Sequence, residues 1–287
     1  MVARCSQLKS RAGSPRTRWR WGDFADGEMS VAVRLSSGLL ACLLLALPAA
    51  SQVPRGALRL DVNIPAYRLD AWRDSTLVST WGVGVGMRTW KTPVGSYAAS
   101  AVEWNPWWIP PQSAWARDER VTPPGPDNPM GRVKISLGQL IFAHGTPFPE
   151  SVGHAASHGC LRMRNDDAIA LAQLVLRAAT VDSVLVAAMA ADTATRRVDV
   201  QPPIPATVRY DLIEWRGDTL WRYPDVYRRG GATLLRALTQ LAAAGVDTAT
   251  VDRRALRAWL GRRITRPSPL VPTRAAARPT GPAGSGG

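Results

Sequence analysis

Apolar and polar side chains alternate along much of the chain after residue 57, and this pattern constrains the fold more than any other feature. A period of two predicts half-buried strands, with a hairpin over residues 66–86. The expected strands are LRLDVNI (58–64), YRLDAW (67–72), TLVSTWGVGVG (76–86), 96–103, 132–137 and 139–144. The chain is therefore expected to be mainly β.

Three glycines at alternate positions, Gly82, Gly84 and Gly86, leave one face of the strand over 76–86 without side chains. Glycine inside a strand often marks a place where another segment approaches the backbone closely. We expect another part of the chain to pack against this face.

One helix is expected over about 166–178, because Asn165 is a favourable N-cap and Asp166 and Asp167 suit the first turn. The apolar run VDSVLVAAM (181–189) that follows is interpreted as a buried strand. We place one domain over residues 57–190.

A smaller α+β extension is expected over residues 198–263. Its strands are predicted at 207–215 and 219–223, and two helices with apolar stripes follow. Residues 264–287 are rich in Pro, Ala, Gly and Ser, a composition that predicts a disordered tail.

The N-terminal region has the layout of a targeting signal. From Met29 the chain contains one arginine, an apolar run and then small residues, which predicts a signal peptide over 29–50 and export to the periplasm or cell envelope. Residues 1–28 are interpreted as an over-extension of the start. A lipid anchor at Cys42 is the alternative, but apolar residues continue beyond this cysteine.

Charge indicates an anionic partner. Lys and Arg number 36 against 22 Asp and Glu, which gives a formal net charge of +14. Nucleic acid, a membrane face or a carboxylate-rich polymer would be attracted by such a charge. Nucleic acid is disfavoured, because the predicted folded part has no run of Lys or Arg and the chain has an export signal.

A long segment over 104–131 is rich in proline and tryptophan. A loop of this length inside a domain is usually functional or disordered, and buried tryptophans argue against disorder. The four tryptophans either anchor the loop on the core or form a wall of a substrate groove; they are Trp104, Trp107, Trp108 and Trp115.

The chemistry is expected in residues 142–171, which contain all three histidines of the chain beside Cys160. Removal of a signal peptide would leave Cys160 as the only thiol. A nucleophilic thiol needs a base to generate the thiolate and donors for the developing oxyanion. His144 is favoured as the base, because a residue on a paired strand can lie closer to Cys160 than His158 does at i−2.

Further roles follow from the same spacing. His158 is given a supporting role, and the N–H groups of Gly159 and Cys160 are expected to stabilise the oxyanion. Arg162, at i+2 from Cys160, could bind a carboxylate of the substrate. Two alternatives stay open: a zinc site built from the three histidines and the cysteine, and an inert buried thiol.

The segment His144-Gly145-Thr146, followed by Ser157-His158-Gly159-Cys160-Leu161-Arg162-Met163, resembles the active-site motif of the L,D-transpeptidase catalytic domain family. The resemblance covers residues 58–190. Further landmarks that match are NIPAYRL (63–69), TPVG (92–95), NPWWIPP (105–111), PPGPDNPMG (123–131) and NDD (165–167). His154 departs from the pattern, where arginine or lysine is more usual, and it receives no role.

The resemblance implies a β-sandwich and a cysteine transpeptidase of the bacterial cell wall. Cys160 would attack the diaminopimelate–D-alanine bond of a peptidoglycan stem, and an amine of a second stem would resolve the acyl-enzyme. His144 would be the base. Ser157, Gly145, Trp108 and Arg162 are assigned to substrate binding. No metal or organic cofactor is expected, and carbapenems are expected to acylate Cys160.

Three alternatives remain for the function. Water in place of the acceptor amine would make the protein an L,D-carboxypeptidase, and a lysine of an envelope protein would make it a protein-anchoring enzyme. The third alternative is a non-catalytic peptidoglycan-binding module, against which the His144/Cys160 pair argues. The oligomeric state is not predicted.

Overall fold

The computed structural model describes residues 56–138 and 140–271. The predicted signal peptide, the start-site extension and Cys42 lie outside these residues. The strands and helices of the first part are β1 (Leu58–Asn63), β2 (Arg68–Arg73), β3 (Thr76–Gly82), β4 (Val85–Gly86), β5 (Gly95–Trp104), β6 (Val133–Gly138), β7 (Ile141–Gly145), β8 (Ala155–Ser157), β9 (Leu161–Met163), α1 (Asn165–Ala178) and α2 (Ser183–Ala191). The second part contains β10 (Arg196–Arg209), β11 (Ile213–Arg216), β12 (Thr219–Arg222), α3 (Leu234–Ala243), α4 (Arg253–Gly261) and β13 (Ser268–Leu270).

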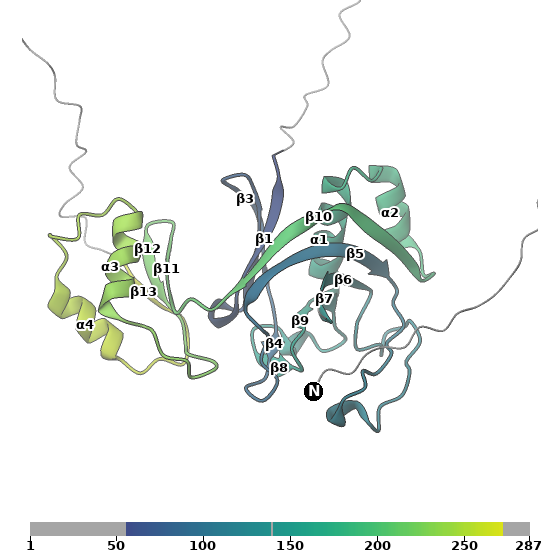
Figure 1. Cartoon of the computed structure of the whole chain (residues 1–287), viewed down its shortest axis with the longest axis horizontal. Coiled ribbons are helices and arrows are strands. Elements are labelled where there is room, and N and C mark those ends of the chain that lie inside the picture. Colours follow the sequence, from purple (N-terminus) through teal and green to yellow (C-terminus); the bar gives the residue numbers. More distant parts are fainter. Residues whose placement is uncertain (1–55, 139, 272–287) are drawn as a thin grey trace, which may run out of the picture. The chain divides into compact units, whose positions relative to one another are not determined.

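Eight strands form the main sheet in the order β3-β2-β1-β10-β5-β6-β7-β9. Its neighbours are antiparallel except for the parallel pairs β1–β10 and β7–β9. The long strands β5 and β10 run side by side (Figure 1). The predicted mainly β class and the hairpin formed by β2 and β3 are therefore confirmed.

The two ends of this sheet are joined by the chain that leaves β3. Gly84 exchanges two backbone hydrogen bonds with Arg162 of β9, at N···O distances of 2.7 and 2.9 Å. Val85 and Gly86 then pair with β8. Because β3 and β9 lie at opposite ends of the strand order, these bonds fold the sheet over onto itself, as in a sandwich.

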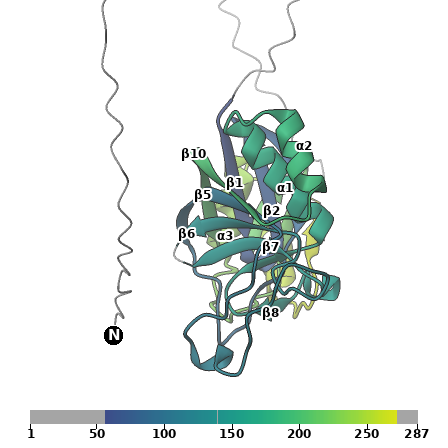
Figure 2. The ribbon, with the colours of Figure 1, turned by 90° about the vertical axis from the view of Figure 1, so that its right-hand side faces the viewer.

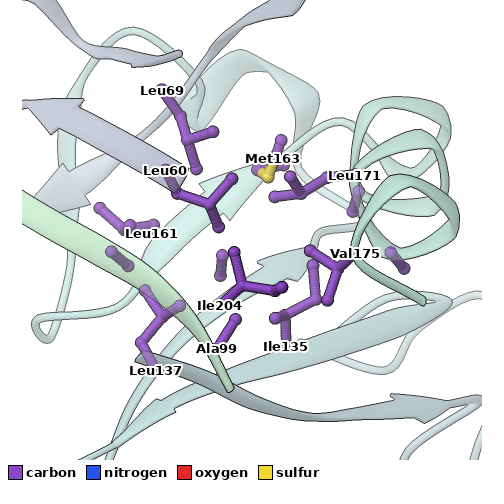
Figure 3. Packing of buried hydrophobic residues seen from close by; sticks show 14 of the residues in the cluster. Leu60, Leu69, Ala99, Ile135, Leu137, Leu161, Met163, Leu171, Val175 and Ile204 are labelled. Carbon is purple, nitrogen blue, oxygen red and sulfur yellow. The ribbon is translucent and has the colours of Figure 1, made fainter. Parts of the chain in front are cut away.

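Apolar side chains from both ends of the sheet and from α1 fill the enclosed space (Figure 3). The labelled core residues are Leu60, Leu69, Ala99, Ile135, Leu137, Leu161, Met163, Leu171, Val175 and Ile204. Helices α1 and α2 lie on the same side of the sheet (Figure 2). Their contact with it buries the apolar face of α1, which includes Leu171 and Val175.

The predicted buried strand over 181–189 is wrong, because these residues form the helix α2. The Asp182 carboxylate accepts hydrogen bonds from the N–H groups of Val184 and Leu185, and so caps the helix N-terminus. Val184 and Leu185 are exposed. A short apolar run does not distinguish a strand from a helix by periodicity, and here the capping aspartate favours the helix.

The expected boundary between the domain and the extension also requires correction. Strand β10, which we placed mostly in the extension, lies at the centre of the main sheet between β1 and β5. The main sheet therefore continues to residue 209. The tail predicted from residue 264 is also too long, since β13 (Ser268–Leu270) pairs with β12; residues 272–287 lie outside the described part.

The remaining residues form what we call the C-terminal module (residues 210–271), a three-stranded sheet β11-β12-β13 with α3 and α4. It has its own core, which includes Ile213, Leu220, Leu241, Leu256 and Trp259. In the described part of the chain, no helix is long and apolar enough to cross a membrane.

Buried ion pairs connect the module to the main sheet. Glu214 of β11 binds Arg68 of β2 at 2.6 Å and Arg209 of β10 at 2.9 Å. Burial alone would raise the pKa of Glu214, but hydrogen bonds and positive charge from the two arginines lower this pKa to about 2. The carboxylate is therefore charged at all physiological pH values, and it holds both strands.

The close approach at Gly84 yields a test of the fold. A Cβ atom at this position would overlap the backbone carbonyl of Ser151 and lie 3.3 Å from the Cβ of Arg162. Because backbone must move to make room, we expect Gly84→Ala to lower the free energy of unfolding by about 2 kcal/mol. Urea denaturation followed by tryptophan fluorescence measures this change.

Gly125→Ala is the matched control. A Cβ atom at Gly125 meets no atom within 4 Å. This control should change stability by less than about 0.5 kcal/mol, as is usual for surface substitutions. Equal stability of the two variants would show that the close approach of Gly84 to Ser151 and Arg162 does not constrain the fold.

Candidate active site

His144 lies near the end of β7 and is almost completely buried, with 4% of its surface exposed. The strand register places it opposite Lys134 of β6 on one side and opposite Arg162 of β9 on the other. Two cationic residues thus flank the imidazole. Strands on both sides fix its backbone, so its position depends on the sheet rather than on a loop.

The register corrects the expected geometry of the histidine and the cysteine. We expected Cys160 to lie opposite His144, but the residue opposite is Arg162. The Cys160 thiol instead lies near residues that come before His144 in the chain. It forms a hydrogen bond with the backbone of Phe142. Its S–H group points to the Leu140 carbonyl oxygen, with 3.9 Å between sulfur and oxygen. Cys160, which directly precedes β9, is therefore displaced from His144 by two positions of the register.

The hydrogen bonding of His144 determines which ring nitrogen can act as a base. Its Nδ1 lies 2.6 Å from the carbonyl oxygen of Gly145. A carbonyl oxygen only accepts, so Nδ1 carries the proton in this tautomer. Nε2 of the neutral ring is then unprotonated and able to accept a proton.

Burial favours the neutral forms of both candidate catalytic groups. It lowers the pKa of His144 to about 4, and the charges of Arg162 and Lys134 act in the same direction. Burial raises the pKa of the Cys160 thiol, although Phe142 and Arg162 act against this effect. Without a ligand at neutral pH, the site therefore holds a thiol and a neutral imidazole.

Arg162 is the positive charge at the centre of this group of residues. Burial lowers the pKa of Arg162. The pKa of His158 is also lowered, mainly by burial of its ring and secondly by the positive charge of Arg162. Among residues 56–138 and 140–271, no carboxylate lies within salt-bridge distance of Arg162. A half-buried guanidinium without a carboxylate partner is suited to an anionic group of a ligand.

Ser157 fixes the turn that presents the cysteine. Its Oγ donates to the Cys160 carbonyl at 2.6 Å and accepts from the Gly159 N–H at 3.1 Å. Gly159 has a φ of +121°, a conformation that residues with a Cβ rarely adopt. Residues 157–160 thus form a tight turn that requires glycine at its third position.

This turn changes the expected oxyanion donors. The Gly159 N–H already donates to Ser157 Oγ, so it is not free as we expected. For the Cys160 N–H, the described residues supply no acceptor. This N–H is therefore the backbone donor that is available beside the thiol.

Two tryptophans pack against His158. The Trp115 ring stacks on the imidazole with 3.8 Å between centroids and 4° between planes. Trp90 approaches it edge-on at 5.9 Å. Of the four tryptophans in the 104–131 loop, Trp115 is thus the one that contacts a histidine of the motif. Trp108 pairs through its backbone with Thr122, and its predicted substrate contact stays a prediction.

Asn165 has a role that sequence reasoning missed. It is the first residue of α1 rather than its N-cap. Its Oδ1 accepts the Arg132 N–H at 3.0 Å, and its Nδ2 donates to the Thr146 carbonyl at 3.3 Å. A Cβ on Gly145 would overlap Asn165 Oδ1, so Gly145 provides the space for a clamp that fixes the backbone just after His144. The sequence Asn-Asp-Asp is typical of a helix start, so Asn165 was interpreted as an N-cap and its hydrogen bonds to Arg132 and Thr146 were not predicted.

The alternative of a zinc site requires several histidine, cysteine or carboxylate side chains to lie close together in space. Within the parts of the chain that the structure describes, no three His, Cys, Asp or Glu side chains form such a group. His154 is exposed, and its backbone accepts the Val85 N–H at 2.9 Å and donates to the Ser151 carbonyl at 3.3 Å.

The low pKa of His144 predicts a pH-dependent stability. The folded protein keeps this ring neutral down to about pH 4, whereas an unfolded chain protonates it near 6.5. The unfolded state binds more protons between these values, so the free energy of unfolding should fall as the pH drops from 6.5 to 4. The loss is about 3 kcal/mol at most.

Chemical denaturation at a series of pH values tests this expectation. His144→Asn should remove most of the slope between pH 6.5 and 4. His154→Gln, which replaces an exposed imidazole, should retain it. A wild-type protein whose stability is flat across this window would contradict the assignment of His144 as a buried neutral base.

Comparison with known proteins agrees with the motif. Residues 57–186 match the YkuD family model, described as the L,D-transpeptidase catalytic domain. The probable L,D-transpeptidase ErfK/SrfK of Escherichia coli is 35% identical over 116 residues, which are 37% of each chain. The putative L,D-transpeptidase YqjB of Bacillus subtilis is 30% identical over 120 residues, which are 40% of this chain and 64% of that protein.

The matched region is limited. The chain spans a little over a third of the length of the Escherichia coli relative. An L,D-transpeptidase from Mycobacterium smegmatis aligns in structure over 53% of this chain and 58% of its own, at 16% identity and a TM-score of 0.36.

Proposed function

Residues 57–186 belong to the L,D-transpeptidase catalytic domain family, and from this membership we propose that the chain is a peptidoglycan L,D-transpeptidase with Cys160 as its nucleophile. The observation that carries the proposal is the pairing of β7 with β9. Across this pair, His144 with an unprotonated Nε2 lies opposite Arg162, which has no carboxylate partner among the described residues. Cys160 directly precedes β9.

The first step is acylation of the enzyme. Nε2 of His144 takes the thiol proton, and Cys160 Sγ attacks the carbonyl carbon between diaminopimelate and the terminal D-alanine of a tetrapeptide stem. A C–S bond forms and the C–N bond breaks. The imidazolium returns the proton to the leaving amine, so D-alanine departs and a thioester remains.

The second step transfers the acyl group. An amine of a second stem attacks the thioester carbonyl, a C–N bond forms and the C–S bond breaks. His144 takes the proton that the amine loses and returns it to the thiolate. The product is a cross-link between two diaminopimelates, and the neutral thiol–imidazole pair of the resting site is restored.

The surrounding residues are proposed to bind and polarise the stem. The free N–H of Cys160 is suited to stabilise the oxyanion, and His158, held between Trp115 and Trp90, supports that side of the site. Gly159 provides the turn. Arg162 is placed to bind a stem carboxylate, while Ser157, Gly145 and Trp108 are the further residues that we assign to substrate contacts.

The cell envelope is the proposed location. A sequence with a predicted signal peptide at 29–50 and a formal net charge of +14 suits a carboxylate-rich polymer outside the cytoplasm.

Intact-protein mass spectrometry tests the nucleophile. The wild-type protein incubated with meropenem should gain the mass of one carbapenem, and incubation with a disaccharide-tetrapeptide should release D-alanine and form a dimer. Cys160→Ala should do neither. Release of D-alanine without a dimer would indicate a carboxypeptidase, and absence of both adduct and turnover would leave a binding module.

The assignment of the base is tested by the two histidines. We expect His144→Gln to slow acylation by meropenem at least about 100-fold, because no other group accepts the thiol proton. His158→Gln should slow it by about tenfold or less, as a supporting contact does. Stopped-flow fluorescence gives both rates. The opposite ranking of the two variants would reverse the roles of His144 and His158.

A further inference from the structure

Tyr227 lies beyond the segment that matches the family model, yet its side chain is buried in the main core and only 3% exposed. Its hydroxyl donates to the Gly86 carbonyl at 2.8 Å and accepts from the Thr92 N–H at 3.0 Å. Residues 86 and 92 are the two ends of one loop. A single phenol from the C-terminal module therefore closes this loop, which we call the 86–92 loop.

Thr92 completes the closure from inside the loop. It is fully buried, and its Oγ1 accepts the Gly86 N–H at 2.8 Å. The N–H of Gly86 thus donates to the Thr92 hydroxyl, and its carbonyl accepts from the Tyr227 hydroxyl. A Cβ on Gly86 would overlap the backbone of Trp90 and Thr92, so the ends of the loop are packed as closely as glycine allows.

The 86–92 loop contacts the residues that precede the nucleophile. The Met87 N–H donates to the Ser157 carbonyl at 2.8 Å, and the Trp90 ring lies against His158. The atom closest to a Cβ built on Gly159 is the Lys91 carbonyl oxygen, at 3.9 Å. The loop therefore touches Ser157, His158 and Gly159, the three residues before Cys160.

Tyr227 is itself held rigidly. Its N–H donates to the Tyr210 hydroxyl at 2.7 Å, and that hydroxyl donates to Asp225 at 2.6 Å. The two tyrosine rings stack with 5.4 Å between centroids. Asp225 also accepts from the N–H groups of Arg229 and Gly230. This arrangement fixes the hydroxyl that closes the loop.

We propose that Tyr227 is a positioning residue of the active site, which holds the 86–92 loop against residues 157–159 and so fixes the orientation of His158 and the Cys160 turn. The catalytic role of that turn rests on the proposed function. The contacts of Tyr227 do not, and the experiment treats the two separately. The C-terminal module would then be part of the working site rather than an appended domain.

Tyr227→Phe removes the two hydrogen bonds and keeps the ring. Tyr223→Phe is its matched control, because the Tyr223 hydroxyl is also buried and also makes two hydrogen bonds, to Glu214 and Arg68 at 3.0 Å each. None of these contacts reaches the 86–92 loop. Both variants are made in the full-length chain, so that loss of stability alone affects them alike.

Amide hydrogen exchange is the first measurement, and it needs no substrate. In Tyr227→Phe, we expect exchange at Met87 and Thr92 to become at least about tenfold faster, as loss of a buried hydrogen bond allows. Tyr223→Phe should leave both amides protected. Unchanged protection in Tyr227→Phe, or equal loss in both variants, would overturn the proposal.

Reaction of Cys160 is the second measurement. We expect meropenem acylation to slow about tenfold in Tyr227→Phe and to stay within about twofold of wild type in Tyr223→Phe. Equal rates in the two variants would overturn the role in positioning. If wild-type protein is neither acylated by meropenem nor active on the disaccharide-tetrapeptide, the proposed function fails. Hydrogen exchange and the rate of iodoacetamide alkylation of Cys160 in the two variants then test the role of Tyr227.

Discussion

The pair of backbone hydrogen bonds between Gly84 and Arg162 is the constraint on which the arrangement of this molecule depends. These bonds join the chain after β3 to β9, the strand at the other end of the main sheet. Strand β9 is only three residues long, and a strand this short has few bonds of its own. With β7 on one side and Gly84 on the other, it is held as firmly as a central strand. Of the residues that we assign to chemistry, Arg162 lies on β9, His158 to Cys160 lie directly before it, and His144 lies on the neighbouring β7.

Three partly buried arginines fall into two groups, according to whether a carboxylate lies beside the guanidinium. Arg68 and Arg209 are paired with Glu214, Asp70 and Asp61, and such pairs compensate the cost of burying charge. Arg162 lacks a carboxylate partner among the described residues and lies beside two ionisable groups that burial keeps neutral. We propose that a carboxylate of the substrate supplies the partner that Arg162 lacks.

Local pattern in the sequence was sufficient for strands β1 to β3 and β5 to β7 and for helix α1, since alternation and an acidic first helical turn are features of a few neighbouring residues. It was insufficient wherever a distant segment decides the outcome. Asn165 looks like an N-cap, but its side chain is used by Arg132 and Thr146. The register of β7 against β9 could not be read from spacing, so the residue opposite His144 was misassigned. Trp90 and Tyr227 reach the site through contacts that no local motif encodes.

The position of β10 explains why the boundary of the domain was misjudged and why the C-terminal module matters to the site. The extension was expected to begin at residue 198, but the sheet is completed only when β10 enters between β1 and β5. The chain then leaves the sheet at Arg209, forms the β11–β12 hairpin and returns, so that Tyr227 packs into the main core. A segment that crosses out of the core and back again cannot be separated from it without loss of buried contacts. The folded domain is thus longer than residues 57–186, which match the family model, and Tyr227 from its last part binds both ends of the 86–92 loop.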